Sequence, residues 1–227
     1  MQRIDALVEK ARSRARFRIA ALRLEYPGQD EVALGRRLVA SMALRAGLAG
    51  AVTGTLSLVA LPLGLPAGVA ISLLLEAELI FALLELYGVD TEGEQGQLKL
   101  YALWAGAGFA DAAKSVGLRA GATAVGRVLR GSLPGRIIRR LNPVLWKAIL
   151  RRLGLEWLPR AAKLWPVLGA PIGFALDRAT LRALGDATLA TLDDAARARR
   201  RVRPTKDYRK AVPGRQPARY ATAAKAK

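Results

Sequence analysis

The chain has 227 residues, of which 37 are Lys or Arg and 18 are Asp or Glu, and its formal net charge is +19 at pH 7. It contains no cysteine and no histidine, which excludes disulfides, thiolate nucleophiles, Cys/His zinc sites and an imidazole general base. The length allows one domain with a sizeable core, and the charge predicts attraction to polyanions, either anionic lipid or nucleic acid.

Residues 2–25 form the first predicted helix. Apolar side chains recur there every three or four positions, with Arg and Lys between them, as in an amphipathic helix. These apolar residues are Ile4, Val8, Ala11, Ala15, Ile19 and Leu22. The charges between Arg3 and Arg23 leave no neutral stretch of the kind that a secretory signal contains, so we expect a cytoplasmic protein.

A turn at Tyr26-Pro27-Gly28 ends the first helix, and a second helix follows. Asp30 is a suitable N-cap for this helix, which we expect to run to about Arg45. Its apolar stripe consists of Leu34, Leu38 and Met42. Residues 1–45 are therefore predicted to be two basic amphipathic helices.

The thirty residues 46–75 contain no charged side chain. Such a run is longer than the roughly 20 apolar residues that cross a bilayer core. Pro62 and Pro66 divide it, however, and a helix cannot continue through the turn that they form. We therefore predict an apolar helical hairpin over residues 46–87, with Gly88 as the C-cap of its second helix.

The hairpin contains features that favour two different surroundings. Gly47, Gly50 and Gly54 stand at helical spacing and let another helix approach closely, as in membrane helix pairs or in a tightly packed soluble core. Both alternatives remain open at this point. The turn is rich in leucine, and we predict contact with a membrane or a partner there. These leucines are Leu56, Leu58, Leu61, Leu63 and Leu65.

Carboxylates occupy the second half of the hairpin. Glu76, Glu78 and Glu85 would each cost about 2.5–3.5 kcal/mol at a bilayer centre, which argues against two full spans. Glu78 and Glu85 are seven residues apart and share one helix face. Carboxylate metal bundles normally add Glu-x-x-His motifs, so we interpret this face as solvated or paired with arginine. Asp111 and Lys114 are interpreted as a surface ion pair.

Three further helices are predicted after residue 90, and residues 117–130 either extend the first of them or begin another. Thr91 and Glu94 have the spacing of a capping box before a helix through residues 98–114. Asn142-Pro143 is a good start for a helix through Leu153, and Pro166 starts a long final helix that could reach Arg199. From about residue 195 the chain is rich in Arg, Lys, Pro and Ala, which is typical of a disordered tail.

These elements predict an all-α fold, a single multi-helix bundle built around the apolar hairpin. We expect a helical domain over residues 1–194 and a disordered basic tail over residues 195–227. No phosphate-binding loop or nucleophile motif is present, and Gly106-Ala107-Gly108 lies inside a helical pattern rather than after a strand. We therefore expect no catalytic residue, no metal and no cofactor.

A basic surface is predicted in the stretch 136–163, where tryptophans lie between the cationic residues. Such a pattern is typical of a helix that lies in a lipid headgroup layer. The alternative is an ordinary amphipathic helix with solvated arginines. The cationic residues predicted to contact an anionic surface are Arg136, Arg139, Arg140, Lys147 and Arg151.

Two blocks of sequence together resemble the EcsC family. The first contains Ala49–Gly54 and the turn Leu61–Pro66, and its long second helix closes on Leu86–Asp90. The second is Trp165–Gly173, followed by a helix through Gly185-Asp186-Ala187. With the helix between them they cover roughly residues 35–195. The resemblance implies a helical bacterial protein associated with the membrane, whose family namesake is encoded beside an ABC transporter, and it brings no established active site.

These observations favour a non-enzymatic helical protein attached peripherally to the inner face of the cytoplasmic membrane, in contact with anionic lipid or with a membrane-protein assembly such as a transporter. The first alternative is a soluble nucleic-acid-binding protein, although no recognition motif is evident. The second is a protein or enzyme that binds lipid or another apolar ligand, with Glu78, Glu85 or Asp111 as the base.

Overall fold

The fold was examined in a computed structural model, which describes residues 2–55, 67–106, 108–115, 124–130, 133–145, 147, 149 and 166–202. All regular elements in these ranges are helices, which confirms the predicted all-α fold class. They are α1 (Gln2–Glu25), α2 (Glu31–Thr55), α3 (Ala67–Leu86), α4 (Gly93–Ala105), α5 (Gly108–Ser115), α6 (Ala124–Arg130) and α8 (Pro166–Val202). Residues 135–145 are helical as well.

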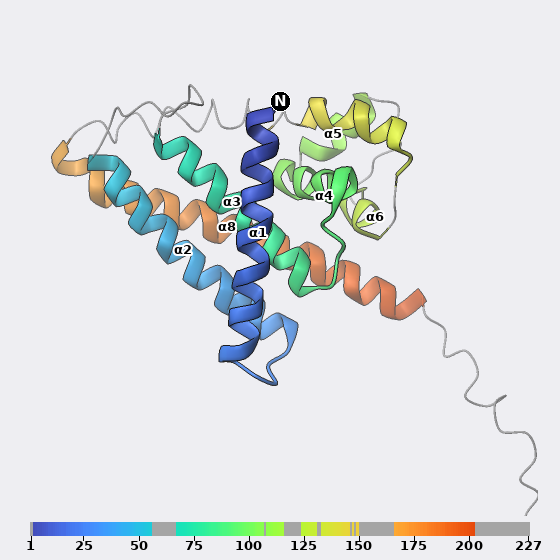
Figure 1. The fold of residues 1–227 in the computed structure, drawn as a ribbon, viewed down its shortest axis with the longest axis horizontal. Coiled ribbons are helices and arrows are strands. Elements are labelled where there is room, and N and C mark those ends of the chain that lie inside the picture. Colours follow the sequence, from blue (N-terminus) through green and yellow to red (C-terminus); the bar gives the residue numbers. More distant parts are fainter. Residues whose placement is uncertain are drawn as a thin grey trace, which may run out of the picture.

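The helices are arranged around α3. Figure 1 shows α2, α3 and α8 running obliquely through the molecule and α1 crossing in front of them, with α4, α5 and α6 gathered on one side. The most extensive helix contacts join α2 to α8 and α1 to α3. Because helices surround α3, its residues 79–84 are all fully buried. A helix that is apolar on every side is stable in such a central position.

The burial of α1 and α2 follows the predicted stripes. On α1, the side chains of Val8, Ala11, Ala15 and Ile19 are buried, and on α2 those of Leu34, Leu38 and Met42 are buried. These residues join α3 in one hydrophobic core. The amphipathic periodicity therefore identified the inner faces of both helices.

Two predicted helix boundaries are confirmed by hydrogen bonds. The Ala33 N–H donates to Asp30 Oδ1 over 2.7 Å, which is the expected N-cap of α2. At the end of α3, Gly88 has φ +63°, and the Val89 N–H donates to the Leu84 carbonyl over 2.9 Å. The Gly88 N–H donates to the Glu85 carbonyl over 3.1 Å, which completes a Schellman motif.

Two helix boundaries differ from the prediction. The second helix does not end near Arg45 but continues as α2 to Thr55, because its glycines lie against α8. The helix predicted through residues 98–114 is divided, since Gly106 adopts φ +53° between α4 and α5. Glycine reaches this left-handed conformation without steric cost.

Two predicted helix starts are wrong, the capping box of Thr91 and Glu94 and the start at Asn142-Pro143. The Thr91 hydroxyl donates to Glu85 Oε1 over 2.7 Å, and the N-cap of α4 is Glu92, which makes no side-chain cap hydrogen bond. The helix around Pro143 already begins at residue 135, where the Pro134 carbonyl accepts hydrogen bonds from the Ile137 and Ile138 N–H groups. Proline suits the start of a helix because it needs no N–H partner, and Pro134 takes this role.

The final helix α8 begins at Pro166 as predicted and ends at Val202, beyond the predicted tail boundary at residue 195. The Ala195 side chain is buried in the core. Arg197 Nη1 lies 3.6 Å from Asp194 Oδ1, which is three residues earlier in the same helix. Burial of Leu192 and Ala195 therefore extends the helix into the basic sequence. Residues 203–227 lie outside the described residues.

Candidate functional site

The contact between α2 and α8 is built on glycines. A Cβ atom on Gly50 would lie 2.4 Å from the Gly173 carbonyl oxygen and 2.4 Å from Asp177 Oδ2. A Cβ atom on Gly47 would lie 2.8 Å from the Phe174 ring. No real Cβ fits at these distances, so the two helices touch through their backbones. Two glycine-containing segments that are far apart in the sequence thus meet at Gly50 and Gly173.

This contact determines which side of α2 is turned outward. Leu44, Leu48 and Val52 follow each other every four residues along α2, and 46%, 55% and 55% of their surfaces are exposed. Side chains at this spacing line one face of a helix. The described part of α2 ends three residues later, at Thr55. We call Leu44, Leu48 and Val52 the α2 stripe.

The α2 stripe lies at one end of the molecule. Figure 1 shows the C-terminal end of α2, the N-terminal end of α3 and the N-terminal end of α8 at the same end of the long axis. Ile71, near the start of α3, is also an exposed large hydrophobic residue. The predicted contact leucines of the turn, Leu56, Leu58, Leu61, Leu63 and Leu65, lie outside the described residues.

The predicted basic surface lies on an amphipathic helix, as expected, which includes residues 135–145. Arg136, Arg139, Arg140 and Lys147 are exposed, and Arg151 lies outside the described residues. The opposite face is buried in the core through Ile138, Leu141, Leu145 and Ile149. Both of the interpretations given to this stretch, headgroup contact and solvated arginines, require this arrangement.

The acidic face of α3 is paired with arginines of α1, as interpreted from the sequence. Glu78, only 1% exposed, accepts hydrogen bonds from Arg18 Nε and Nη2 over 2.7 and 2.5 Å. Glu85 Oε1 accepts a hydrogen bond from Arg16 Nε over 3.0 Å. Arg16 also pairs with Glu92, and this hydrogen bond together with that to Glu85 raises the Arg16 pKa. The predicted Asp111–Lys114 surface pair is confirmed, with 3.7 Å between Oδ1 and Nζ.

One buried cation lies among these pairs. Arg12 faces the core, and its guanidinium carbon lies 5.2 Å from the centroid of the Phe81 ring. Its Nη1 donates to Glu9 Oε2 over 2.8 Å. The sequence analysis did not single out Arg12, although it follows Ala11 on the apolar side of α1. This position on the apolar side of α1 is the feature of the sequence that could have predicted the burial of Arg12.

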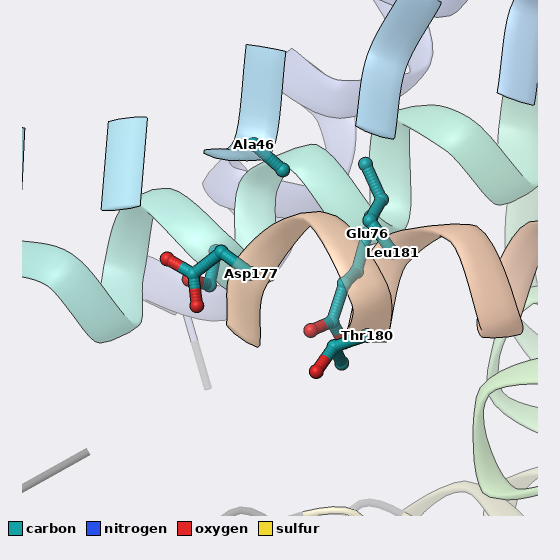
Figure 2. A pocket seen from close by; sticks show the side chains of 6 residues that line it. Ala46, Glu76, Asp177, Thr180 and Leu181 are labelled. Carbon is teal, nitrogen blue, oxygen red and sulfur yellow. The ribbon is translucent and has the colours of Figure 1, made fainter. Parts of the chain in front are cut away.

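A small space lined by both polar and apolar side chains lies between α2, α3 and α8. It has a volume of about 10 Å³, the size of a single water molecule, and Figure 2 shows Glu76, Asp177 and Thr180 around it. Glu76 and Asp177 are both buried, and Glu76 Oε2 accepts a hydrogen bond from Trp104 Nε1 over 2.6 Å. Sequence analysis named Glu76 only as a cost to membrane insertion and missed Asp177, whose role depends on the approach of α8 to α2.

The described residues hold no group of three or more acidic side chains that could bind a metal ion. None of the described helices combines the length and apolar character needed to cross a membrane. Comparisons with protein-family models, with curated proteins and with solved structures produce no match. The interpretation of this site therefore rests on its own geometry and charge.

Proposed function

We propose that this protein binds anionic membrane surfaces, without catalysing a reaction, through the end of the molecule that carries the α2 stripe. The exposure of Leu44, Leu48 and Val52 is the observation that carries the proposal. Contiguous exposed apolar side chains on a protein surface mark contact sites for a membrane or for another protein. Here the stripe leads along α2 into a sequence without charges, residues 56–75.

Burial of the stripe in lipid would be favourable. Each fully buried Val or Leu side chain contributes about 1.5–3 kcal/mol relative to full exposure. The three residues are about half exposed, so their transfer into lipid would contribute on the order of 3 kcal/mol together. That is a weak anchor by itself. A second attraction is needed for stable attachment.

The basic residues would supply this second attraction. Arg136, Arg139, Arg140 and Lys147 are exposed, and a cation near an anionic membrane contributes about 1 kcal/mol. In the view of Figure 1, the helix formed by residues 135–145 and the end of α2 both lie along the upper edge of the molecule. A membrane along this edge would lie near both helices. The resemblance to the membrane-associated EcsC family agrees with such a role.

Flotation of the purified protein with vesicles tests the proposal. We expect the full chain to float with vesicles of phosphatidylcholine containing 30% phosphatidylglycerol, and much less with phosphatidylcholine alone. The variant Leu44→Ser/Leu48→Ser/Val52→Ser should lose on the order of 100-fold in vesicle affinity, as about 3 kcal/mol implies. The matched control is Ala183→Ser/Ala187→Ser/Ala190→Ser, which changes three exposed positions of α8.

Two results would contradict the proposal. Failure of the unmodified chain to float with anionic vesicles would remove its basis. Equal flotation of the α2-stripe variant and the α8 control would show that these side chains do not contact lipid. Circular dichroism of both variants establishes that each remains folded. Replacement of Arg136, Arg139 and Arg140 by Gln should weaken binding and reduce its dependence on salt.

A further inference from the structure

The helix α1 has two faces with different partners. The inner face carries Val8, Ala11, Ala15 and Ile19, which are buried against the core. The outer face carries Lys10, Arg14, Phe17, Ala21 and Leu24, all of them exposed. At 100° per residue these five positions fall within an arc of about 80°. Figure 1 shows α1 in front of α3, with no other labelled helix in front of it.

The outer face contains the two most exposed large hydrophobic residues of the described chain. Phe17 is 80% exposed and Leu24 is 83% exposed. They are seven residues apart, two helical turns, and Ala21 lies on the same side between them. Lys10 and Arg14 continue the same face toward the N-terminus and make no ion pair with a described residue. The outer face is therefore both apolar and cationic.

Two sets of ion pairs and one hydrogen bond to a backbone carbonyl hold α1 in this orientation. Arg18 binds Glu78 on α3, Arg16 binds Glu85 and Glu92, and Arg23 Nη2 donates to the Leu86 carbonyl over 3.4 Å. These arginines flank the inner face of the helix. Rotation of α1 to bury Phe17 and Leu24 would break the pairs and leave Glu78 buried without its cation, which is costly. The exposed hydrophobic side chains are thus held outward.

We propose that the outer face of α1 is a second lipid-contact surface. Phe17 and Leu24 would enter the boundary between headgroups and acyl chains, while Lys10 and Arg14 would bind the phosphates of anionic lipids. A helix that lies in the interface uses large apolar side chains and cations in this way. The inference rests on the proposed membrane binding and extends it to a surface on a different helix from the α2 stripe.

The charge of α1 favours lipid over a second copy of the chain. The helix carries seven cationic and three acidic side chains, so two α1 helices would repel each other. Phe17 and Leu24 also protrude singly from the helix rather than lining a groove. A protein partner would need pockets at matching positions, whereas the bilayer interface accepts apolar side chains at any spacing. An anionic bilayer therefore suits both the charge and the shape of this face.

The absence of cysteine allows a direct test with the full chain. A cysteine at Phe17 or at Leu24 can be labelled with the fluorophore NBD, with no competing thiol. With vesicles containing 30% phosphatidylglycerol, we expect a blue shift of NBD emission and quenching by lipids spin-labelled on the acyl chain. Label at the exposed Ala183 of α8 is the control and should show neither. Label at Leu48 reports the α2 stripe separately.

The combinations of results distinguish the two proposals. Quenching at positions 17 and 24 supports the inference, whatever position 48 shows. Quenching at position 48 without quenching at 17 and 24 overturns the inference and leaves the proposed function intact. Absence of quenching at all three positions overturns both. The variant Phe17→Ser/Leu24→Ser should also lose vesicle affinity, on the order of tenfold for each side chain, and unchanged affinity would point to a protein partner and contradict the inference.

Discussion

Gly50 of α2 and Gly173 of α8 are in direct backbone contact. A Cβ atom on Gly173 would lie 2.3 Å from the Gly50 carbonyl oxygen, and one on Gly50 would lie 2.4 Å from the Gly173 carbonyl oxygen. The two residues are far apart in the sequence but define the closest approach of the two helices with the most extensive contact. The exposure of the α2 stripe depends on this approach.

Substitution of either glycine should destabilise the fold. In Gly50→Ala or Gly173→Ala the methyl group would collide with backbone atoms, and we expect a loss of about 3 kcal/mol in the free energy of unfolding, measured by urea denaturation. The matched control is Gly108→Ala at the start of α5, where a Cβ atom meets nothing within 4 Å. The control should leave stability unchanged or slightly raised. Equal stability of all three variants would contradict the contact.

Removal of Arg18 should destabilise the protein because Glu78 is almost fully buried. We expect Arg18→Ala to cost about 3 kcal/mol in urea denaturation, since it leaves a buried carboxylate without its cation. The double variant Arg18→Met/Glu78→Leu replaces both charges and should recover most of this loss. A double variant no more stable than Arg18→Ala would argue against the pair. Lys114→Ala breaks an exposed pair and serves as a control that changes stability by less than about 0.5 kcal/mol.

Tyr87 should make stability sensitive to alkaline pH. Burial raises the pKa of Tyr87 above its usual value of about 10, and the hydrogen bond to Asp193 Oδ1 over 2.5 Å adds to this effect. A raised pKa in the folded state means that the contribution of Tyr87 is fully present below about pH 10 and is lost as the pH rises toward the folded pKa. Tyr87→Phe should cost about 1 kcal/mol at pH 7.

The pH profile of Tyr87→Phe provides the decisive comparison. Thermal melts between pH 7 and pH 11.5 should show that the difference between wild type and variant shrinks above about pH 10. A difference that stays constant across this range would show that ionisation of Tyr87 does not contribute. Because Tyr87 and Asp193 link the end of α3 to α8, the same variant should also increase hydrogen exchange near the end of α3.

Trp104 should be coupled energetically to Glu76. Trp104→Phe keeps an aromatic ring in the core but removes the Nε1 donor, which lies 2.6 Å from Glu76 Oε2. We expect a loss of about 2 kcal/mol, because the buried Glu76 Oε2 loses this donor. A double-mutant cycle with Glu76→Leu, which removes the acceptor, should give a coupling energy of at least about 1 kcal/mol in chemical denaturation. Additive effects of the two substitutions would show that this hydrogen bond contributes little.

Features that depend on neighbouring residues were predicted correctly from the sequence. The buried faces of α1 and α2 follow from apolar spacing, because side chains three and four residues apart share one side of a helix. The Asp30 N-cap and the Gly88 C-cap follow from local hydrogen bonding and from the conformational freedom of glycine. The all-α class follows from the same periodicity.

Features that depend on distant partners were predicted only in part or not at all. Thr91 and Glu94 have the spacing of a capping box, but the Thr91 hydroxyl instead donates a hydrogen bond to Glu85 Oε1 of α3, and α4 begins after Glu92. The acidic face of α3 was expected to be solvated or paired, and only the crossing of α1 selects Arg18 for Glu78 and Arg16 for Glu85. The space between Glu76 and Asp177 exists because α8 approaches α2 and α3 there.

The division between local and long-range information is clearest for α2. Its sequence determines a helix rich in glycine and leucine, since helical spacing and small side chains are properties of the segment itself. It does not determine which side of that helix meets solvent. The backbone contact of Gly50 with Gly173 places α8 on one side of α2 and leaves Leu44, Leu48 and Val52 on another. Exposure arises from the packing of whole helices, so only the tertiary structure decides which leucines are available to a membrane.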